Sequence, residues 1–283
     1  MLTITQWHEQ ALATKLDDRS LLLRTSIYKT VHAGGRGHIG SAFSLIEILR
    51  VLYDDILRYQ PQNPQWIERD LCILSKGHGC LALYALLADK GFFPRHQLNT
   101  FCKIDSLLGG HPEPKLPGVE WPTGSLGHGL AVAVGVALAN RMKNRENKVF
   151  VITGDGEINE GSIWESALSA AKHKLDRLTV MIDYNKQQSY GPTKMVLDLE
   201  PLSDKWRSFG FFVFEANGHD IVSLHNTLLA SEKEKGKPKV IICHTVKGKG
   251  LSIAEDNPKW HNKSKLTKDE IFAMQQAFNL VEN

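Results

Sequence analysis

The chain has 283 residues, of which 42% are hydrophobic and 23% are charged, which are ordinary proportions for a globular protein. These proportions exclude a disordered chain, and a formal net charge of only +3 argues against a nucleic-acid scaffold, which usually presents a basic face. Glycine is abundant, at 23 residues, and clusters at 34–40, 77–79, 109–110, 124–129, 154–161 and 248–250. Glycine placed repeatedly where elements join is typical of backbone that comes close to a ligand.

Neither a signal peptide nor a membrane span is expected. Residues 1–18 lack a charged start followed by an apolar block. The longest apolar stretch, residues 130–139, is shorter than the ~20 residues needed to cross a bilayer. The four cysteines show no CxxC spacing, so we expect reduced thiols rather than disulfides or a zinc site. These features predict a soluble protein of the cytoplasm, without a nucleic-acid or membrane partner.

Short apolar runs, each followed by glycine or polar residues, are predicted to be buried strands. These runs are residues 71–74, 149–152, 178–182, 211–214 and 240–243. Segments with apolar residues at helical spacing lie before, between and after them. These predicted helices are residues 3–31, 45–57, 81–90, 126–142, 162–173, 221–233 and 268–278.

The alternation of strands and helices predicts parallel βαβ units. Because the strands are almost continuously apolar, the sheet is expected to be covered by helices on both faces. We therefore predict an α/β fold with a doubly wound, mostly parallel sheet of about five or six strands. No linker-like composition divides the chain, so residues 1–283 are predicted to form a single domain. Residues 92–121, rich in proline, glycine and histidine, are predicted to be a long irregular segment.

Polar residues follow two successive predicted strands. Asp155 lies between two glycines after one strand, and Asn185 follows the next. Ligands of parallel α/β sheets bind at the carboxyl ends of the strands, so both side chains should lie on one rim. A carboxylate and an amide oxygen form a hard-cation site that needs further oxygens, such as those of a diphosphate. The alternative is a tight Asp-Gly turn with a solvated asparagine.

The segment 154–165, with Asn185, resembles the thiamine diphosphate signature in the form found in transketolases. Further segments match the family in its order over nearly the whole chain. They are residues 37–40, 75–79, 110–113, 123–129, 217–220, 245–250 and 260–261. The resemblance implies a thiamine diphosphate-binding fold and thiamine diphosphate as the cofactor.

The length suggests which part of a transketolase this chain represents. The family combines a thiamine diphosphate domain, a pyrimidine domain and a C-terminal domain, and the resemblance covers only the first. The glutamate that activates the aminopyrimidine belongs to the pyrimidine domain. The resemblance therefore implies the N-terminal subunit of a split transketolase. A separate C-terminal subunit carrying the pyrimidine domain would complete it, as a heterotetramer.

The resemblance also assigns residues to the cofactor. Asp155, Asn185 and the carbonyl of Gln187 would bind Mg²⁺ or Ca²⁺. The other cofactor-binding residues are His78 and Gly156 at the diphosphate, Gly124 and Leu126 at the aminopyrimidine, and Glu157, Ile158 and Glu160 in the loop after the metal ligand. Glu160 would lie at the subunit interface, although an acid favoured by a helix N-terminus is an equal alternative. Lys247 and Lys249 would either contact a phosphate or lie in a solvated, mobile loop.

Three histidines match those that bind the sugar phosphates and move protons in the family. They are His38, His111 and His261. Breaking the ketose requires loss of a hydroxyl proton and the aldose oxygen must gain one, and histidine can do both near neutral pH. Asn262 follows the last of them, where the family usually has glycine. The role of His128 stays open.

The implied function is transfer of a two-carbon ketol unit from a ketose phosphate to an aldose phosphate. One alternative is a subunit of another thiamine enzyme, a 2-oxo-acid dehydrogenase alpha chain or a deoxyxylulose-phosphate synthase type. Those families share the Gly-Asp-Gly motif and the asparagine that follows the next strand, but His38, His78 and His111 together favour sugar transfer. Another alternative is a noncatalytic cofactor-binding partner, against which the intact Asp155 and Asn185 argue.

Overall fold

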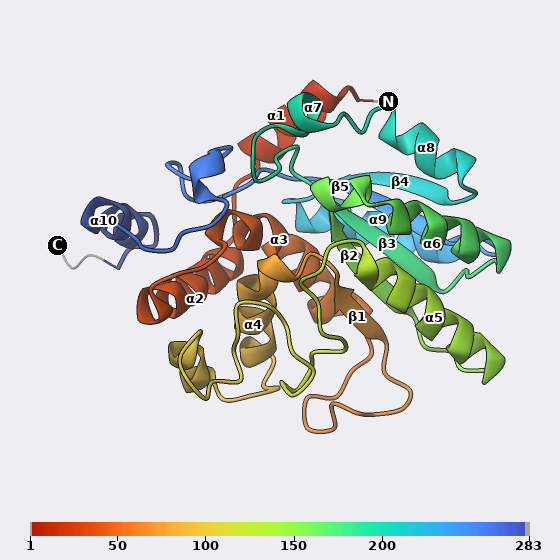
Figure 1. The fold of residues 1–283 in the computed structure, drawn as a ribbon, viewed down its shortest axis with the longest axis horizontal. Helices are drawn as coiled ribbons and strands as arrows, with labels where there is room; N and C mark the ends of the chain where they lie inside the picture. Colours follow the sequence, from red (N-terminus) through yellow and green to blue (C-terminus); the bar gives the residue numbers. More distant parts are fainter. Residues whose placement is uncertain (1, 281–283) are drawn as a thin grey trace.

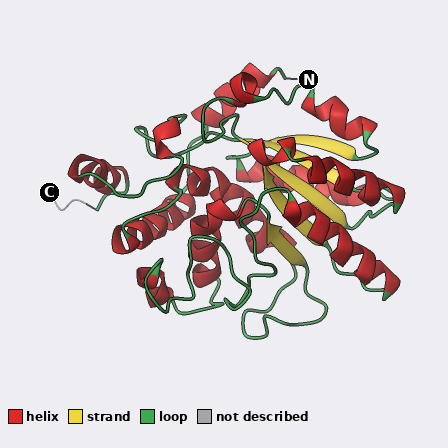
Figure 2. Cartoon of the chain, in the orientation of Figure 1, coloured by secondary structure: helices red, strands yellow, loops and turns green. Residues whose placement is uncertain are grey.

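The strands lie in a single parallel sheet. The computed structural model describes residues 2–280. Within them, the sheet is five-stranded, in the order β1-β2-β3-β5-β4, and its strands are drawn in yellow in Figure 2. The strands are β1 (Leu71–Leu74), β2 (Val149–Gly154), β3 (Leu178–Tyr184), β4 (Phe212–Asn217) and β5 (Lys239–His244). Every residue of the three central strands is buried, as the continuous apolar runs predict.

Helices cover both faces of this sheet (Figure 1). They are α1 (Ile4–Ala13), α2 (Asp18–Gly34), α3 (Ile39–Val51), α4 (Cys80–Asp89), α5 (His128–Met142), α6 (Gly161–Lys172), α7 (Thr193–Val196), α8 (Leu202–Ser208), α9 (Ile221–Lys233) and α10 (Lys268–Ala277). Alternate strand residues point to opposite faces, so Ile152 packs with the core of α3 and α4, whereas Val151 packs with that of α5 and α6. This doubly wound arrangement confirms the predicted fold class.

Several predicted boundaries are wrong, and caps explain two of them. The predicted helix 3–31 is two helices. The first ends where the backbone becomes extended at Thr14, and Asp17 caps the second by accepting a hydrogen bond from the Ser20 amide. The helix predicted to begin at 126 begins at His128, because Gly127 adopts a left-handed φ of 81°. The spacing of apolar residues predicts neither the cap at Asp17 nor the left-handed backbone at Gly127.

Other boundaries shift without changing the topology. The helix predicted at 45–57 begins at Ile39, ends at Val51 and continues as a π-helical turn over Leu52–Ile56. Strands β2 and β3 each run two residues beyond their predicted ends, and β4 begins one residue late. Residues 92–121 form an irregular segment that contains one 3-10 turn, Arg95–Thr100.

Two further features bear on the expectations from the sequence. The four cysteines, all within the described residues, are free, and three of them are buried while Cys102 is exposed. No helix in residues 2–280 is long and apolar enough to cross a membrane.

Candidate functional site

The carboxyl ends of β2 and β3 bring Asp155 and Asn185 to one rim. The two strands pair in parallel with Gly154 opposite Asp183, so the next residues leave the sheet side by side. Asp155 accepts hydrogen bonds from the backbone amides of Gly156, at 2.7 Å, and of Lys186, at 2.5 Å. The bond from Lys186 joins the two loops, whereas the bond from Gly156 lies within the first of them.

Asp155 and Asn185 line a cavity of about 240 Å³, here called the inner pocket. Most of the predicted residues line it together: His38, His78, Gly124, Leu126, Asp155, Gly156, Glu157, Asn185, Gln187 and His261. Lys76, Ser41, Gly154, Gln188, Ser189 and Lys247 complete the lining. The structure thus gathers residues from seven separate segments at the carboxyl edge of the sheet, where α/β proteins bind ligands.

Three predicted residues relate to this pocket differently. Ile158 is fully buried in the core below it and does not line it. Glu160 is exposed at the start of α6, and its side chain makes no capping hydrogen bond. Glu157 lines the pocket, but its carboxylate accepts hydrogen bonds from Ser75 Oγ and from the amides of Gly127 and Gly154. Its carboxylate therefore joins three loops.

A buried ion pair beneath the pocket was missed from the sequence. Lys76 Nζ lies 2.5 Å from Asp183 Oδ2, and both side chains are buried. Asp183 also accepts hydrogen bonds from the hydroxyls of Ser44 and Thr245. Burial raises the pKa of Asp183, but the charge and hydrogen bond of Lys76, together with the hydrogen bonds of Ser44 and Thr245, outweigh it, so the net shift is downward. A lone aspartate in an apolar strand was a signal that Asp183 needs a buried partner, although it does not identify Lys76 as that partner.

The loop after β5 brings a second lysine to the pocket. Lys247 is buried and donates to the carbonyl of Gln187 at 3.1 Å, and its Nζ lies 2.9 Å from His261 Nδ1. An ammonium can only donate, so Nδ1 accepts and the neutral His261 ring carries its proton on Nε2. The solvated-loop alternative for Lys247 and Lys249 is therefore wrong, since both are buried and Lys249 donates to the carbonyl of Leu12.

A fully buried network fixes this loop. Glu47 accepts from Arg24 through both its oxygens, at 2.7 and 3.1 Å, and from His219 Nδ1 at 2.8 Å. The other nitrogen of His219 accepts from the amide of Val246 at 2.9 Å. Arg24 also donates to the carbonyl of Lys249 at 2.8 Å. The network therefore links α2 and α3 to both sides of Lys247.

The inner pocket contains polar groups that lack partners. Burial, reinforced by the charge of Asp183, raises the pKa of Asp155 to about 6. Burial and the charge of Lys76 lower the pKa of Lys247 to about 8. Within residues 2–280, the buried Gln187 Oε1 and Gln188 Nε2 have no hydrogen-bond partner. Burying charged groups costs free energy, and a cation beside Asp155 and an anion beside the lysines would offset that cost. The residues present therefore fit a metal–diphosphate group.

The oxygen donors limit the kind of metal site. No group of three or more His, Cys, Asp or Glu that could hold a metal occurs in the described part of the chain. The candidate ligands are one carboxylate, one side-chain amide and one backbone carbonyl. Such a set suits a hard cation that takes its remaining oxygens from water and phosphate.

Four histidines from separate segments cluster around His38, and three of them, His38, His78 and His261, line the inner pocket. The ring centroid of His38 lies 5.5 Å from those of His78 and His261 and 6.1 Å from that of His111. Burial, with the positive charges nearby, lowers the pKa of His38 to about 4 and that of His261 to about 3. Burial also lowers the pKa of His78 and of His111. All four rings are therefore neutral at pH 7.

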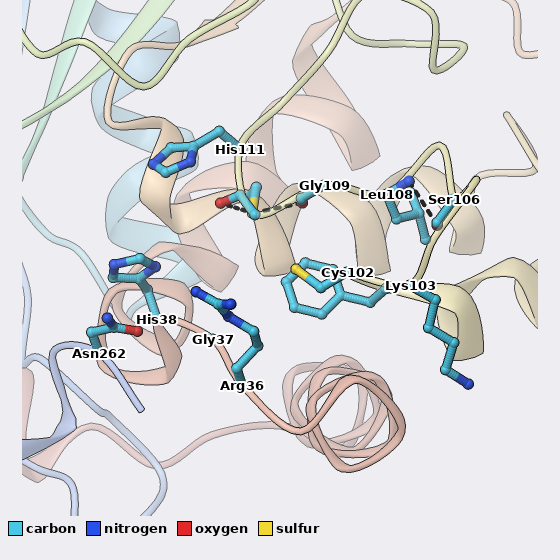
Figure 3. Close-up of a pocket in the computed structure, with 13 residues that line it drawn as sticks. Arg36, Gly37, His38, Cys102, Lys103, Ser106, Leu108, Gly109, His111 and Asn262 are labelled. Atoms are coloured by element: carbon cyan, nitrogen blue, oxygen red, sulfur yellow. Dashed lines mark hydrogen bonds between the residues drawn. The ribbon is translucent and has the colours of Figure 1, made fainter. Parts of the chain in front are cut away.

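A second cavity, of about 360 Å³, adjoins the inner pocket at His38 and is here called the outer pocket (Figure 3). Its lining is Arg36, Gly37, His38, Cys80, Phe101, Cys102, Lys103, Ser106, Leu108, Gly109, Gly110, His111 and Asn262. His111 thus lies on the outer side of the histidine cluster and His261 on the inner side. The long irregular segment supplies most of this wall.

Comparison with known proteins gives a consistent result. A family model described as the thiamine diphosphate-binding domain of transketolase matches residues 20–282. The chain is 48% identical over 228 residues to one subunit of the apulose-4-phosphate transketolase of Actinobacillus succinogenes, covering 80% of this chain and 82% of that protein. It is 41% identical over 255 residues to a 6-deoxy-6-sulfo-D-fructose transketolase subunit of a Clostridium species, covering 90% and 92% respectively.

Solved structures agree with these relatives. Transketolase from Leishmania mexicana matches with a TM-score of 0.86 at 31% identity, over 99% of this chain and 42% of that chain. This chain therefore spans about two fifths of the length of that solved structure.

Proposed function

The chain belongs to the transketolase family through its thiamine diphosphate-binding domain, and from this premise we propose that it is the cofactor-binding subunit of a split transketolase. The observation that carries the proposal is the gathering of Asp155, Asn185 and the Gln187 carbonyl in one pocket, with the histidine cluster at its mouth. Two relatives are named as transketolase subunits, which supports a separate partner chain with the pyrimidine domain. We infer a heterotetramer in which residues 1–283 form one domain.

The cofactor site follows from the donors in the inner pocket. Asp155, Asn185 and the Gln187 carbonyl would hold Mg²⁺, or Ca²⁺, whose other ligands are diphosphate oxygens and water. The Gly156 amide and His78 would bind the diphosphate, beside the charges of Lys76 and Lys247. The backbone at Gly124 and Leu126 would face the aminopyrimidine, and Glu160 would face the partner chain. When bound, thiamine diphosphate supplies the chemistry that breaks and remakes the carbon–carbon bond.

The histidines supply proton transfer at the substrate. Because burial lowers their pKa values, His38 and His261 are neutral at pH 7. His38 has an unprotonated nitrogen available, whereas Nδ1 of His261 accepts from Lys247, so His261 presents its Nε2–H as a donor. A neutral imidazole can accept the proton that a ketose hydroxyl loses, and the imidazolium can return it to the acceptor oxygen. His111, on the outer side of the cluster, is placed to contact the more distant hydroxyls.

The relatives also indicate the substrate class. Two of them are named for sugars that carry a phosphate or a sulfo group, apulose-4-phosphate and 6-deoxy-6-sulfo-D-fructose. We infer that this chain also acts on sugars with a terminal oxyanion group, a ketose as donor and an aldose as acceptor. Pentose phosphates are the first substrates to try.

Reconstitution tests this function. The purified chain, a partner chain with the pyrimidine domain, thiamine diphosphate and Mg²⁺ are mixed with a ketose phosphate and an aldose phosphate. Two-carbon transfer is expected only when both chains are present. Full transfer by this chain alone would refute the split-enzyme proposal, and no transfer by the complex with any oxyanion-bearing sugar would refute the activity.

Substitution of the metal ligands tests the site separately. Asp155→Ala or Asn185→Ala in the complex should weaken metal-dependent cofactor binding by more than about 100-fold, because even outer-shell partners of a metal site typically contribute 10–100-fold. Calorimetry measures the affinity. The matched control is Asp204→Ala, an exposed carboxylate whose partner is Arg207 and which should leave the affinity unchanged. Unchanged affinity in Asp155→Ala would overturn the metal assignment.

A further inference from the structure

A third cavity, here called the edge pocket, lies at the opposite edge of the sheet from the inner pocket. Its volume is about 240 Å³, and it is lined by Ala137, Asn140, Arg141, Asn144, Arg145, Glu146, Asn147, Leu175, Asp176 and Arg177. These residues belong to the end of α5 and to the two segments that enter β2 and β3. The two strands begin with Val149 opposite Leu178, so the segments before them lie side by side. The edge pocket shares no residue with the inner or the outer pocket.

Backbone bonds cap the helix that ends at this cavity. Asn144, just after α5, adopts a left-handed φ of 51°, and its amide donates to the Arg141 carbonyl at 3.0 Å. The amide of Arg145 donates to the Asn140 carbonyl at 2.9 Å, which completes the turn. Arginines near the end of a helix often cap its free carbonyls. Because backbone amides already bond these carbonyls, capping of α5 does not account for the arginines of the edge pocket.

Two arginines of the edge pocket connect its walls. Helices α5 and α6 pack side by side on one face of the sheet (Figure 1), and Arg141 of α5 donates to the His173 carbonyl at the end of α6. Arg177, before β3, donates to the Glu146 carbonyl at 2.7 Å and pairs with the carboxylate of the same residue at 2.8 Å. These bonds give both arginines a structural role that needs no ligand.

Arg145 has no such role. Its side chain is half-buried and forms no hydrogen bond or ion pair within residues 2–280. The two acids of the pocket have other partners, since Glu146 pairs with Arg177 and Asp176 accepts from the Gly236 amide at 3.0 Å. Arg145 therefore brings to the edge pocket a positive charge, and N–H donors, that the described part of the chain does not use.

A buried amide in the lining also lacks a partner. Asn140 is only 7% exposed, and its Nδ2 has no hydrogen-bond partner among the residues that the structure describes. Buried polar groups are rarely left in this state, because an unpaired one costs free energy. Asn147, which lines the same cavity, follows the rule and donates to the carbonyls of Ile67 and Arg69. An oxygen atom of a ligand in the edge pocket would supply the acceptor that Asn140 lacks.

We propose that the edge pocket binds a small organic anion, whose phosphate or carboxylate oxygens accept hydrogen bonds from Arg145 and Asn140. A guanidinium binds either group through two parallel N–H donors. Ala137 and Leu175 give the carbon skeleton apolar surface to contact. The cavity has the volume of about eight waters, which suits a compound of three or four carbons. The proposal goes beyond the transketolase activity, since none of these residues reaches the cofactor site.

Calorimetry on the full chain tests for the site, with glycerol 3-phosphate and malonate as probes and glycerol as the neutral control. At least one anion should bind, and glycerol should not. Arg145→Met should weaken this binding by about 10–100-fold, as expected for loss of hydrogen bonds to a charged group. Asn140→Leu should weaken it less. Lys143→Met, which removes an exposed cation outside the lining, should leave it unchanged.

The Arg145 side chain has no bonded partner in the described chain, so Arg145→Met should leave the fold intact. Binding of glycerol 3-phosphate alone would identify a phosphate site, and binding of malonate alone a carboxylate site. Absence of binding by both anions, or binding that Arg145→Met does not weaken, would overturn the proposal.

A second measurement locates the anion. Phenylglyoxal modifies accessible arginines, and mass spectrometry of the resulting peptides follows each arginine separately. The bound anion should slow modification of Arg145, and glycerol should not. Arg95, exposed and paired with Asp89 outside the edge pocket, should react at one rate throughout. Protection of Arg36 without protection of Arg145 would place the anion in the outer pocket and refute the edge site. Neither measurement needs the partner chain or turnover, so the result is independent of the proposed function.

Discussion

The inner and outer pockets share His38, but their charged groups are held differently. In the inner pocket Lys76 is paired with Asp183, and Lys247 is bonded to the Gln187 carbonyl and His261. In the outer pocket the Arg36 side chain has no bonded partner among the described residues, and His111 is exposed. The residues of the inner pocket lie at strand ends and in a loop that hydrogen bonds connect to two helices. The residues of the outer pocket lie mostly in the irregular segment 92–121 and in the segment before α3.

This difference follows from burial. A buried charge costs several kcal/mol unless it is paired, so the inner pocket can exist only if the chain itself supplies most of the partners. An exposed arginine is satisfied by water and needs no partner until a ligand replaces that water. The inner pocket is therefore largely formed before anything binds, whereas the outer pocket is arranged to exchange water for a ligand.

The largest effect on stability is expected from a substitution in the buried network of Glu47 that fixes the Lys247 loop. Glu47→Gln removes the charge that compensates the buried Arg24, and it weakens the bond that orients His219 toward Val246. Breaking one partner of a fully buried pair typically costs about 3–5 kcal/mol. We expect a loss of that size in the free energy of unfolding, measured by urea denaturation.

The control for this substitution is an ion pair on the surface. Asp204→Asn removes the partner of Arg207 in an exposed pair one helical turn apart, and should change the free energy of unfolding by less than about 1 kcal/mol. Equal effects of the two substitutions would contradict the view that the Lys247 loop is anchored by the buried network.

Much of the fold could be predicted from the spacing of apolar residues and from the glycine and polar residues that follow each apolar run. Continuous apolar runs identify the strands, and their alternation with helical segments identifies the parallel sheet. The errors lie where one residue controls a boundary. Asp17 starts a helix with its side chain, and Gly127 delays one with its backbone angle.

Some residues of the candidate site could likewise be predicted from the sequence, and others could not. Asp155 and Asn185 could be placed on one rim, because parallel strands fix where their ends meet. Lys76 and Asp183 could not be paired, because 107 positions separate them and no local pattern records the contact. Glu47 is also hidden, since a glutamate on a predicted helix is expected to be solvated, whereas every residue of α3 is buried.

A smaller effect of the same network should show in the pH dependence of stability. Burial lowers the pKa of His219 although Glu47 opposes the shift, so the folded protein binds its proton less readily than the unfolded chain does. Below the unfolded pKa of 6.5 the unfolded chain gains this proton first, and stability falls with pH. The loss is at most about 2 kcal/mol at pH 5 for one histidine.

The measurement compares wild type with His219→Gln between pH 7 and pH 5. Asp155 and Glu157, whose pKa values are raised, contribute with the opposite sign, so the slope of wild type alone mixes several groups. The difference between the two proteins isolates His219. Wild type should lose more stability than the variant as the pH falls, and parallel profiles would contradict the neutral, bridging role of His219.

The smallest effect on stability is expected on the outer side. His111 is exposed, and the bonded groups near it are backbone, since the Tyr84 hydroxyl donates to the His111 carbonyl. His111→Gln should therefore change the free energy of unfolding by less than about 0.5 kcal/mol, as is usual for surface positions. If His111 contacts the sugar as proposed, the same substitution should still lower kcat/KM of the complex, with cofactor affinity unchanged by calorimetry. A loss of cofactor affinity in His111→Gln would show that the two pockets are coupled beyond His38 and would weaken the division between them.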